Sequence, residues 1–259
     1  MLLILGGASL PFYLQYRQSA PQRLLLGAQK LESRGAIQDA QQLYQRLYRD
    51  YPNSVQAPGA LLQTGRIWQL DRHHDEQALL SYLQLEHDYP KSPLAQTARE
   101  EAAQLVKYSM RDYSRAIEYY QRLLDTAGDK TDQYLYEIAD CYFRLDNYPQ
   151  ARIELETLIE KNPHSSLLPD VLYRKGGLLL LENRPKAARE DWQRLIKEFP
   201  QSVYTPQAKF NLAKLLEEEG KLKEALEQYQ QLKNYPRPAL LEEKIEHLKQ
   251  RIKMKKKAI

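Results

Sequence analysis

One spacing of residues recurs along the chain and constrains its fold more than any other feature. In residues 176–200, Gly176 is followed after twelve positions by Ala188, and then by Trp192, Leu195 and Pro200. The spacing i, i+4, i+7 places Ala188, Trp192 and Leu195 on one face of a helix. A proline ends a helix because it has no N–H to donate. The segment therefore predicts two antiparallel helices that cross at Gly176 and Ala188, where a larger side chain would hold them apart.

The same spacing occurs in five other places. Each copy has a small residue in its first helix (helix A), an alanine in its second (helix B), a large apolar residue four positions later and a leucine three after that. The copies are Ala28/Ala40/Tyr44/Leu47, Gly65/Ala78/Tyr82/Leu85, Ala103/Ala116/Tyr120/Leu123, Ala139/Ala151/Leu155/Leu158, Gly176/Ala188/Trp192/Leu195 and Ala213/Ala225/Tyr229/Leu232. The helix B alanines are 35 to 38 residues apart. This period predicts six stacked helical hairpins in an all-α solenoid.

The segments between hairpins also resemble one another. They read YPNSVQAP at 51–58, YPKSPLAQ at 89–96, NPHSSLLP at 162–169 and FPQSVYTP at 199–206. We expect the serine of each segment to cap the next helix or to order the turn before it. These serines are Ser54, Ser92, Ser165 and Ser202. After the third hairpin Gly128 replaces the proline, and we expect it to end the helix in a left-handed conformation.

These features resemble the tetratricopeptide repeat (TPR), a helical hairpin of about 34 residues. The aromatic-Pro-x-Ser linkers are similar to those of a subgroup in the bacterial cell envelope. That subgroup includes the TPR lipoprotein of the outer-membrane β-barrel assembly machine and the periplasmic TPR protein of the Tol system. The resemblance covers residues 36–236 and implies a right-handed superhelical solenoid that acts as a non-enzymatic adaptor. It divides the chain into an apolar segment at 1–16, six repeats at 20–236, and a capping helix with a basic tail at 237–259.

The N-terminus is the most apolar part of the chain. Residues 1–14, MLLILGGASLPFYL, are fewer than the roughly 20 that a membrane-spanning helix needs. We interpret them as an anchor, with a degraded signal sequence or a segment buried against a partner as alternatives. Arg17, Arg23 and Lys30 follow, and the positive-inside rule would place the solenoid in the cytoplasm. The linkers instead favour the periplasmic side of a bacterial inner membrane, which is our prediction.

The C-terminal segment, Pro238 to Lys257, predicts one more helix. Leu241, Ile245, Leu248 and Ile252 form an apolar stripe that would cover the last repeat; a coiled coil with a partner is the alternative. The tail carries six basic residues, and removing them from the formal net charge of +4 leaves −2 for residues 1–247. The repeats therefore lack a basic nucleic-acid surface, and nucleic acid is disfavoured as a partner. The tail itself reads as a solvated helix end, or as a contact with anionic lipid or RNA.

No pattern in the sequence indicates catalysis, a metal or a cofactor. His73, His74 and Asp75 form the only histidine cluster, and no third ligand stands at a convincing spacing. Cys141 is the only cysteine and is interpreted as a small packing residue. We therefore predict a protein that is not an enzyme and has no cofactor.

The TPR resemblance implies a binding surface on the concave face, which helix A of each hairpin lines. Ligand contacts tend to come from three positions before, one after and four after the small residue of helix A. The predicted binding residues are Arg66, Gln69, Gln104, Lys107, Tyr136, Asp140, Phe143, Tyr173, Phe210 and Lys214, with Glu100 and Glu217 at related positions. Tyr136, Tyr173 and Phe210 are predicted to form a continuous aromatic strip, or else to pack between neighbouring A helices. Aromatic anchors beside charges suit an extended peptide.

The sequence therefore predicts an interaction scaffold of the bacterial cell envelope. Its partners would be other proteins, which the envelope resemblance implies to be those of a membrane-associated complex, and the membrane through residues 1–14. Two alternatives stay open: a cytoplasmic TPR regulator whose basic tail contacts membrane or nucleic acid, and a structural accessory subunit of a membrane complex.

Overall fold

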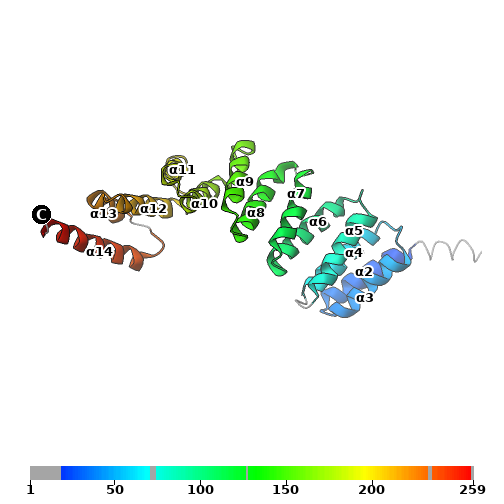
Figure 1. The fold of residues 1–259 in the computed structure, drawn as a ribbon. Helices are drawn as coiled ribbons and strands as arrows, with labels where there is room; N and C mark the ends of the chain where they lie inside the picture. Colours follow the sequence, from blue (N-terminus) through cyan, green and yellow to red (C-terminus); the bar gives the residue numbers. More distant parts are fainter. Residues whose placement is uncertain (1–18, 71–73, 127, 233–234, 258–259) are drawn as a thin grey trace, which may run out of the picture. The chain divides into compact units, whose positions relative to one another are not determined.

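The computed structural model describes residues 19–70, 74–126, 128–232 and 235–257, and every regular element within these ranges is a helix (Figure 1). The chain divides into two compact units at Thr126/Ala127. The first unit contains α2 (Ala20–Ser33), α3 (Ile37–Asp50), α4 (Ala57–Leu70), α5 (Asp75–Asp88), α6 (Pro93–Gln104) and α7 (Tyr113–Leu124). Helix α6 continues as a turn of π-helix, η1 (Leu105–Ser109).

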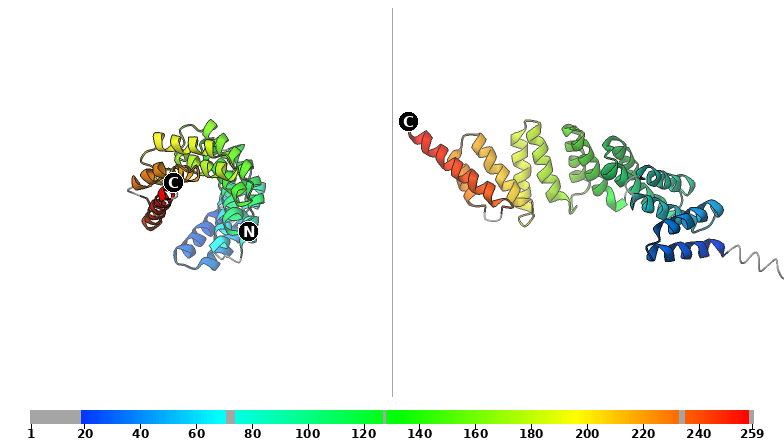
Figure 2. Two further views of the ribbon diagram at one scale, coloured as in Figure 1. Left: turned by 60° about the vertical axis from the view of Figure 1, so that its left-hand side comes forward. Right: turned by 90° about the horizontal axis from the view of Figure 1, so that it is seen from below.

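The second unit begins with the short 3₁₀ helix η2 (Gly128–Lys130). It continues with α8 (Thr131–Arg144), α9 (Tyr148–Lys161), α10 (Leu168–Leu181), α11 (Pro185–Glu198), α12 (Thr205–Glu218), α13 (Leu222–Gln230) and α14 (Pro238–Lys257). Within each unit, consecutive helices pack against each other, and both views of Figure 2 show the paired helices side by side. The predicted all-α hairpin architecture is confirmed.

The repeated residues form the core, as the spacing predicts. All six helix B alanines are fully buried, and the large residues that follow them are at most 3% exposed. The small residues of helix A are also needed for the two helices of a hairpin to pack closely. A Cβ on Gly176 would overlap the indole of Trp192, and a Cβ on Gly65 would overlap the ring of Tyr82. The crossing points therefore tolerate nothing larger in these two hairpins.

Two packed tyrosines of helix B find acceptors in their own hairpin. Tyr44 donates its hydroxyl hydrogen bond to Glu32 at 2.8 Å, and Tyr82 donates to Gln69 at 2.5 Å. Glu32 and Gln69 both lie four positions after the small residue of helix A. A buried hydroxyl needs such a partner because an unpaired one costs about 1–3 kcal/mol. In these two hairpins this position of helix A is therefore a packing position.

We expect stability to fall steeply at alkaline pH. Burial, reinforced by Glu32, raises the pKa of Tyr44, and burial with Asp88 raises the pKa of Tyr48 to about 12. In the unfolded chain these groups titrate near 10.0. The folded state therefore holds protons that the unfolded state loses, so stability is complete below pH 10 and is lost above it. Ultraviolet absorbance of tyrosinate should rise together with helix loss by circular dichroism. Full tyrosine titration with the helices intact would contradict this.

The linker serines order the turns between hairpins, mostly through their side chains. Ser92 is the N-cap of α6, and its Oγ accepts from the N–H of Leu94 at 3.2 Å. Ser165 and Ser202 accept in the same way from the N–H two residues on, at 3.1 and 3.2 Å. The hydroxyl of Ser54 has no partner, and its turn is held by backbone bonds and by the Tyr89 hydroxyl, which donates to the carbonyl of Pro52 at 2.6 Å. The prediction is therefore confirmed for three of the four serines.

Gly128 does not end a helix. Helix α7 ends at Leu124 with Asp125 in a right-handed conformation, and Gly128, with φ of +50°, begins η2. Left-handed residues instead lie in the turns inside five of the hairpins, at Gly35, Arg111, Asp146, Asn183 and Gly220, and residues 71–73 of the remaining turn lie outside the described residues. In these five turns the N–H of the next residue closes the end of helix A, as in the bond from Ala36 to the carbonyl of Leu31 at 2.9 Å.

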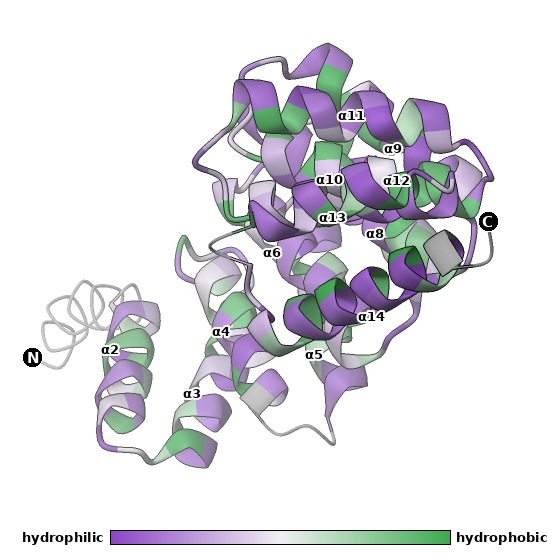
Figure 3. Cartoon of the chain, turned by 90° about the vertical axis from the view of Figure 1, so that its left-hand side faces the viewer, coloured by the Kyte–Doolittle hydropathy of each residue, from purple (hydrophilic) through white to green (hydrophobic). Residues whose placement is uncertain are grey.

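Helix α14 has the bounds that the sequence predicts. Leu241 and Leu248 are buried, and Ile245 and Ile252 pack against a cluster that includes Tyr229 of α13. Hydrophilic residues occupy much of the rest of the helix (Figure 3). Glu217 of α12 accepts ion pairs from Lys244, at 3.6 Å, and from Arg251. The helix thus covers apolar surface of α12 and α13.

The predicted anchor at residues 1–14 lies outside the described residues. Among the residues that the structure describes, no helix is long and apolar enough to cross a membrane. The division of the chain at 1–16, 20–236 and 237–259 stays a prediction.

Candidate protein-binding groove

A groove of about 340 Å³ lies in the second unit, lined mainly by α8 and α10. It contains four of the predicted binding residues, Tyr136, Asp140, Phe143 and Tyr173. Helical geometry explains the grouping, because positions i, i+4 and i+7 share one face of a helix. Tyr136, Asp140 and Phe143 have this spacing on α8. We call this site the α8–α10 groove.

Arg174 of α10 holds one wall of the groove in place. Its guanidinium donates to Asp140 from Nη1 and to Asp170 from Nε, both at 3.1 Å. It also lies 5.0 Å from the centre of the Tyr136 ring, a cation–π distance. Tyr136 donates to Asp170 at 2.5 Å, and burial together with this bond raises its pKa. The wall is therefore preorganised and its charges are paired.

The other wall is apolar and open to solvent. Phe143 is 43% exposed and Leu181, at the end of α10, is 57% exposed. Leu178 and Leu155, which also line the groove, are buried beneath them. Exposed large apolar side chains next to a concave surface are typical of interaction sites.

The groove exists because the fourth hairpin departs from the tyrosine–acceptor pair. Helix α9 carries Leu155 where α3 and α5 carry Tyr44 and Tyr82. A leucine needs no acceptor, so the position that holds Glu32 in the first hairpin holds Phe143 here. The smaller side chain leaves space, and the aromatic residue beside it stays exposed.

The predicted aromatic strip is not continuous. Tyr173 stacks on Tyr204 with ring centres 5.4 Å apart, within the second unit. Phe210 is only 8% exposed and stacks on Tyr235, with ring centres 4.5 Å apart. Phe210 therefore packs α12 against the segment before α14, and it does not line the groove. The structure brings Tyr136 and Tyr173 together at the groove, whereas Phe210 packs, which the sequence left open as the alternative.

The predicted residues of the first unit are mostly engaged in packing. Arg66 binds Glu101 through two bonds at 2.8 and 3.1 Å. Gln69 is the acceptor of Tyr82. Lys107, which the spacing predicts as a binding residue, is only 3% exposed. The third hairpin has one residue more between Ala103 and its helix B alanine than the fourth, and the π-helical turn that contains Lys107 accommodates an extra residue.

The remaining predicted binding residues that the structure describes do not gather at one site. Gln104 is exposed at the end of α6, and Lys214 is exposed and 3.7 Å from Glu218.

Cys141 is buried, as expected for a packing residue. His74 packs on Trp68 with ring centres 4.7 Å apart, and His73 lies outside the described residues. Among the described residues no group of acidic, histidine or cysteine side chains could hold a metal ion.

The sequence analysis did not identify Arg174, Gly177 and Leu181, which also line the groove. The sequence does mark Gly177 as unusual, because the repeat pattern does not require a second glycine beside Gly176 in the middle of a helix. Gly177 and Leu181 also follow from Tyr173 by helical spacing, since they lie four and eight positions after it.

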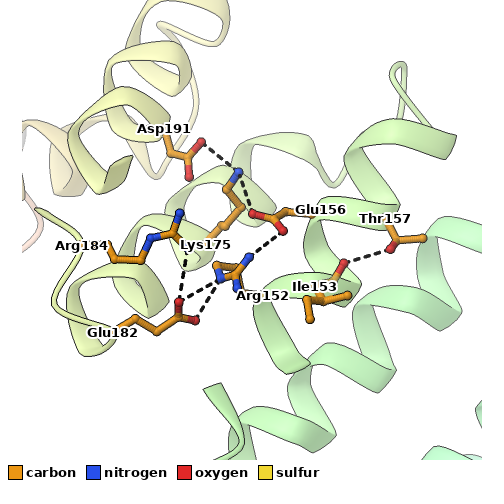
Figure 4. Close-up of polar contacts among 8 residues, drawn as sticks. All are labelled: Arg152, Ile153, Glu156, Thr157, Lys175, Glu182, Arg184 and Asp191. Carbon is orange, nitrogen blue, oxygen red and sulfur yellow. Dashed lines mark hydrogen bonds and ion pairs between the residues drawn. The ribbon is translucent and has the colours of Figure 1, made fainter. Parts of the chain in front are cut away.

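A network of ion pairs fixes α10 against α9 and α11 (Figure 4). Lys175 lies 3.2 Å from Asp191 and 3.7 Å from Glu156, and Arg152 binds Glu156 at 2.7 Å and Glu182 at 3.0 Å. Burial raises the pKa of Asp191, and the charge of Lys175 opposes that rise. Lys175 is one residue from Arg174, so it lies on a different face of α10 from the groove residues. The network thus holds the position of α10 without occupying the groove.

Family models of the tetratricopeptide repeat match residues 23–54, 107–168 and 173–237. The chain therefore belongs to the tetratricopeptide-repeat proteins. Proteins of this family are generally interaction scaffolds that bind other proteins or peptides. No curated protein sequence matches the chain.

Solved structures with the same fold are similar in shape but distant in sequence. A tetratricopeptide repeat protein from Parabacteroides merdae is 16% identical, with a TM-score of 0.55 over 88% of this chain and 98% of that one. The C-terminal part of a TPR protein from Cytophaga hutchinsonii is 16% identical, with a TM-score of 0.61 over 83% and 80%. YrrB, described as a TPR protein with an unusual peptide-binding site, is 14% identical, with a TM-score of 0.53 over 77% and 96%. These similarities show the fold alone.

Proposed function

We propose that this protein is a non-enzymatic scaffold that holds an extended segment of a partner protein in the α8–α10 groove. The observation that carries the proposal is the exposed apolar wall of Phe143 and Leu181 facing the paired charges of Arg174 and Asp140 in one concave site. A fold of this family supplies the scaffold, and YrrB is described as a TPR protein that has a peptide-binding site. The groove volume fits a few side chains, which suits a peptide segment.

Site-specific photo-crosslinking in cells tests the proposal. A photoreactive amino acid at position 143 or 181 should capture one and the same partner protein. The matched control is position 153, because Ile153 is 42% exposed, almost the same as Phe143, and does not line the groove. Adducts at 143 and 181 that are absent at 153 are the expected result. Equal capture of the same protein from 153, or none from 143 and 181, would contradict binding in the groove.

We further propose that residues 1–14 anchor the scaffold to a bacterial membrane, with the repeats on the periplasmic side. The support is the apolar sequence of this segment and the resemblance of the linkers to envelope TPR proteins. Partners would then be subunits of a membrane-associated complex.

Deleting residues 1–16 should move the protein from the membrane to the aqueous fraction without changing its melting temperature. The repeat pattern begins only at Ala28, so the hairpins do not require this segment. Fractionation and thermal unfolding of the full and shortened chains measure the two effects. A clear loss of stability would indicate that the segment packs on the first hairpin. Protection of the repeats from protease in spheroplasts would overturn the periplasmic location.

A further inference from the structure

Helix α10 crosses the groove with two consecutive glycines, and packing explains only one of them. A Cβ on Gly176 would overlap the indole of Trp192. A Cβ on Gly177 would have no atom within 4 Å. Glycine is disfavoured in the middle of a helix because it loses the most conformational freedom there. The fold itself therefore gives no reason for glycine at 177.

The bare backbone at Gly177 lies inside the groove. Tyr173, Gly177 and Leu181 follow one another at four-residue intervals, so they form one row along α10. Gly177 is thus an unfilled position between an aromatic ring and an exposed leucine. Leu155 creates a second unfilled volume on α9, where other hairpins have a ring. Two independent departures from the repeat pattern therefore open the same site.

The lining also restricts the charge of what can enter. Arg174 pairs with Asp140 and Asp170, both at 3.1 Å, and Arg144 lies 3.8 Å from Asp140, so the two carboxylates and two guanidinium groups leave no uncompensated charge for a ligand. Burying a further charge beside these groups would be unfavourable. Asn211 of α12 contributes an amide, which can both donate to and accept from a peptide main chain. The site therefore suits an uncharged apolar side chain on a polypeptide.

We propose that Gly177 determines the specificity of the groove. The partner segment places one bulky uncharged side chain, aromatic or large aliphatic, against the bare backbone of α10 between Tyr173 and Leu181. Neighbouring residues of the segment lie over Phe143. This assignment rests on the proposed function, because it presumes that a polypeptide occupies the groove.

A random peptide library displayed on phage and selected on the full chain is the probe. Selected peptides should share one aromatic, leucine or methionine residue with uncharged neighbours. Gly177→Leu should weaken their binding at least tenfold, because the leucine side chain fills the space. Leucine is also a strong helix former, so the helix itself should be preserved. Gly177→Ala should weaken binding about fivefold, whereas the matched change Gly59→Ala should leave it within twofold. Gly59 is a helical glycine of the first unit whose Cβ would touch only Leu94, at 3.9 Å.

The outcomes separate the two proposals. Phe143→Ala removes an exposed ring of the groove and leaves α10 unchanged. Peptides that lose binding with Phe143→Ala but bind Gly177→Leu within twofold of wild type would overturn the assignment of Gly177 and leave the groove in place. A shared charged residue in the selected peptides would overturn the proposed ligand class. A library without any peptide sensitive to Phe143→Ala would contradict the proposed function itself. Circular dichroism of each variant confirms that the helices are intact.

Discussion

Replacing Gly176 with alanine should lower the free energy of unfolding by about 1–3 kcal/mol, whereas the same change at Gly177 should raise it by about 0.5–1 kcal/mol. The methyl group at 176 would overlap Trp192 and displace its indole, whose Nε1 donates to the carbonyl of Tyr173 at 3.1 Å. The methyl group at 177 meets nothing, so only the gain in helix propensity remains. Two adjacent glycines of one helix should therefore respond with opposite signs.

Urea denaturation followed by circular dichroism measures both effects, and it also serves for the variants that lack Trp192. A compensating pair provides the control. Gly176→Ala combined with Trp192→Leu reproduces the Ala139/Leu155 combination of the fourth hairpin, so adding Gly176→Ala to Trp192→Leu should cost little. Equal destabilisation by Gly176→Ala with and without Trp192 would show that the indole is not the cause. Hydrogen exchange should place the loss in the helices next to α10, because a repeat array is coupled mainly to nearest neighbours.

The hairpins could be predicted from the sequence because their packing repeats at fixed intervals. Ala151 and Leu158, for instance, are fully buried as the spacing requires. The turns inside the hairpins could not be predicted in the same way. Arg111, Asp146 and Asn183 adopt the left-handed conformation without being glycine, so no residue type marks the turn. The π-helical turn at Leu105–Ser109 could not be predicted from the repeat spacing either, and it contains Lys107, which is buried there.

The candidate site was predicted in part, for a physical reason. Counting from the small residue of helix A identifies residues that face the same way, and it located Tyr136 and Asp140 in the groove. It cannot show which of those residues are engaged in packing contacts with other side chains of the protein. Gln69 is taken by Tyr82, and Phe210 by Tyr235. The groove itself exists because Leu155 and Gly177 are small. Unfilled space of this kind can be recognised only when the positions of the neighbouring side chains are known.

Converting the fourth hairpin to the tyrosine–acceptor pair should close the groove while keeping the fold. Leu155→Tyr with Phe143→Glu reproduces the arrangement of Tyr44, Glu32 and Ala28 in the first hairpin, because Ala139 stands where Ala28 does. The new ring would occupy the space that Leu155 leaves open, and the new carboxylate would accept its hydroxyl. We expect capture of the partner from a photoreactive residue at position 181 to fall at least tenfold, equivalent to about 1.4 kcal/mol.

The single variants distinguish a closed groove from a damaged fold. Leu155→Tyr alone buries a hydroxyl without its acceptor and should destabilise the second unit by about 1–3 kcal/mol. Adding Phe143→Glu should restore most of that stability, as the bond of Tyr44 to Glu32 indicates, but should not restore binding. Between the single and the double variant, stability would then rise while capture stays low. A double variant that is as stable as the wild type and still captures the partner at position 181 would show that the partner does not enter the α8–α10 groove.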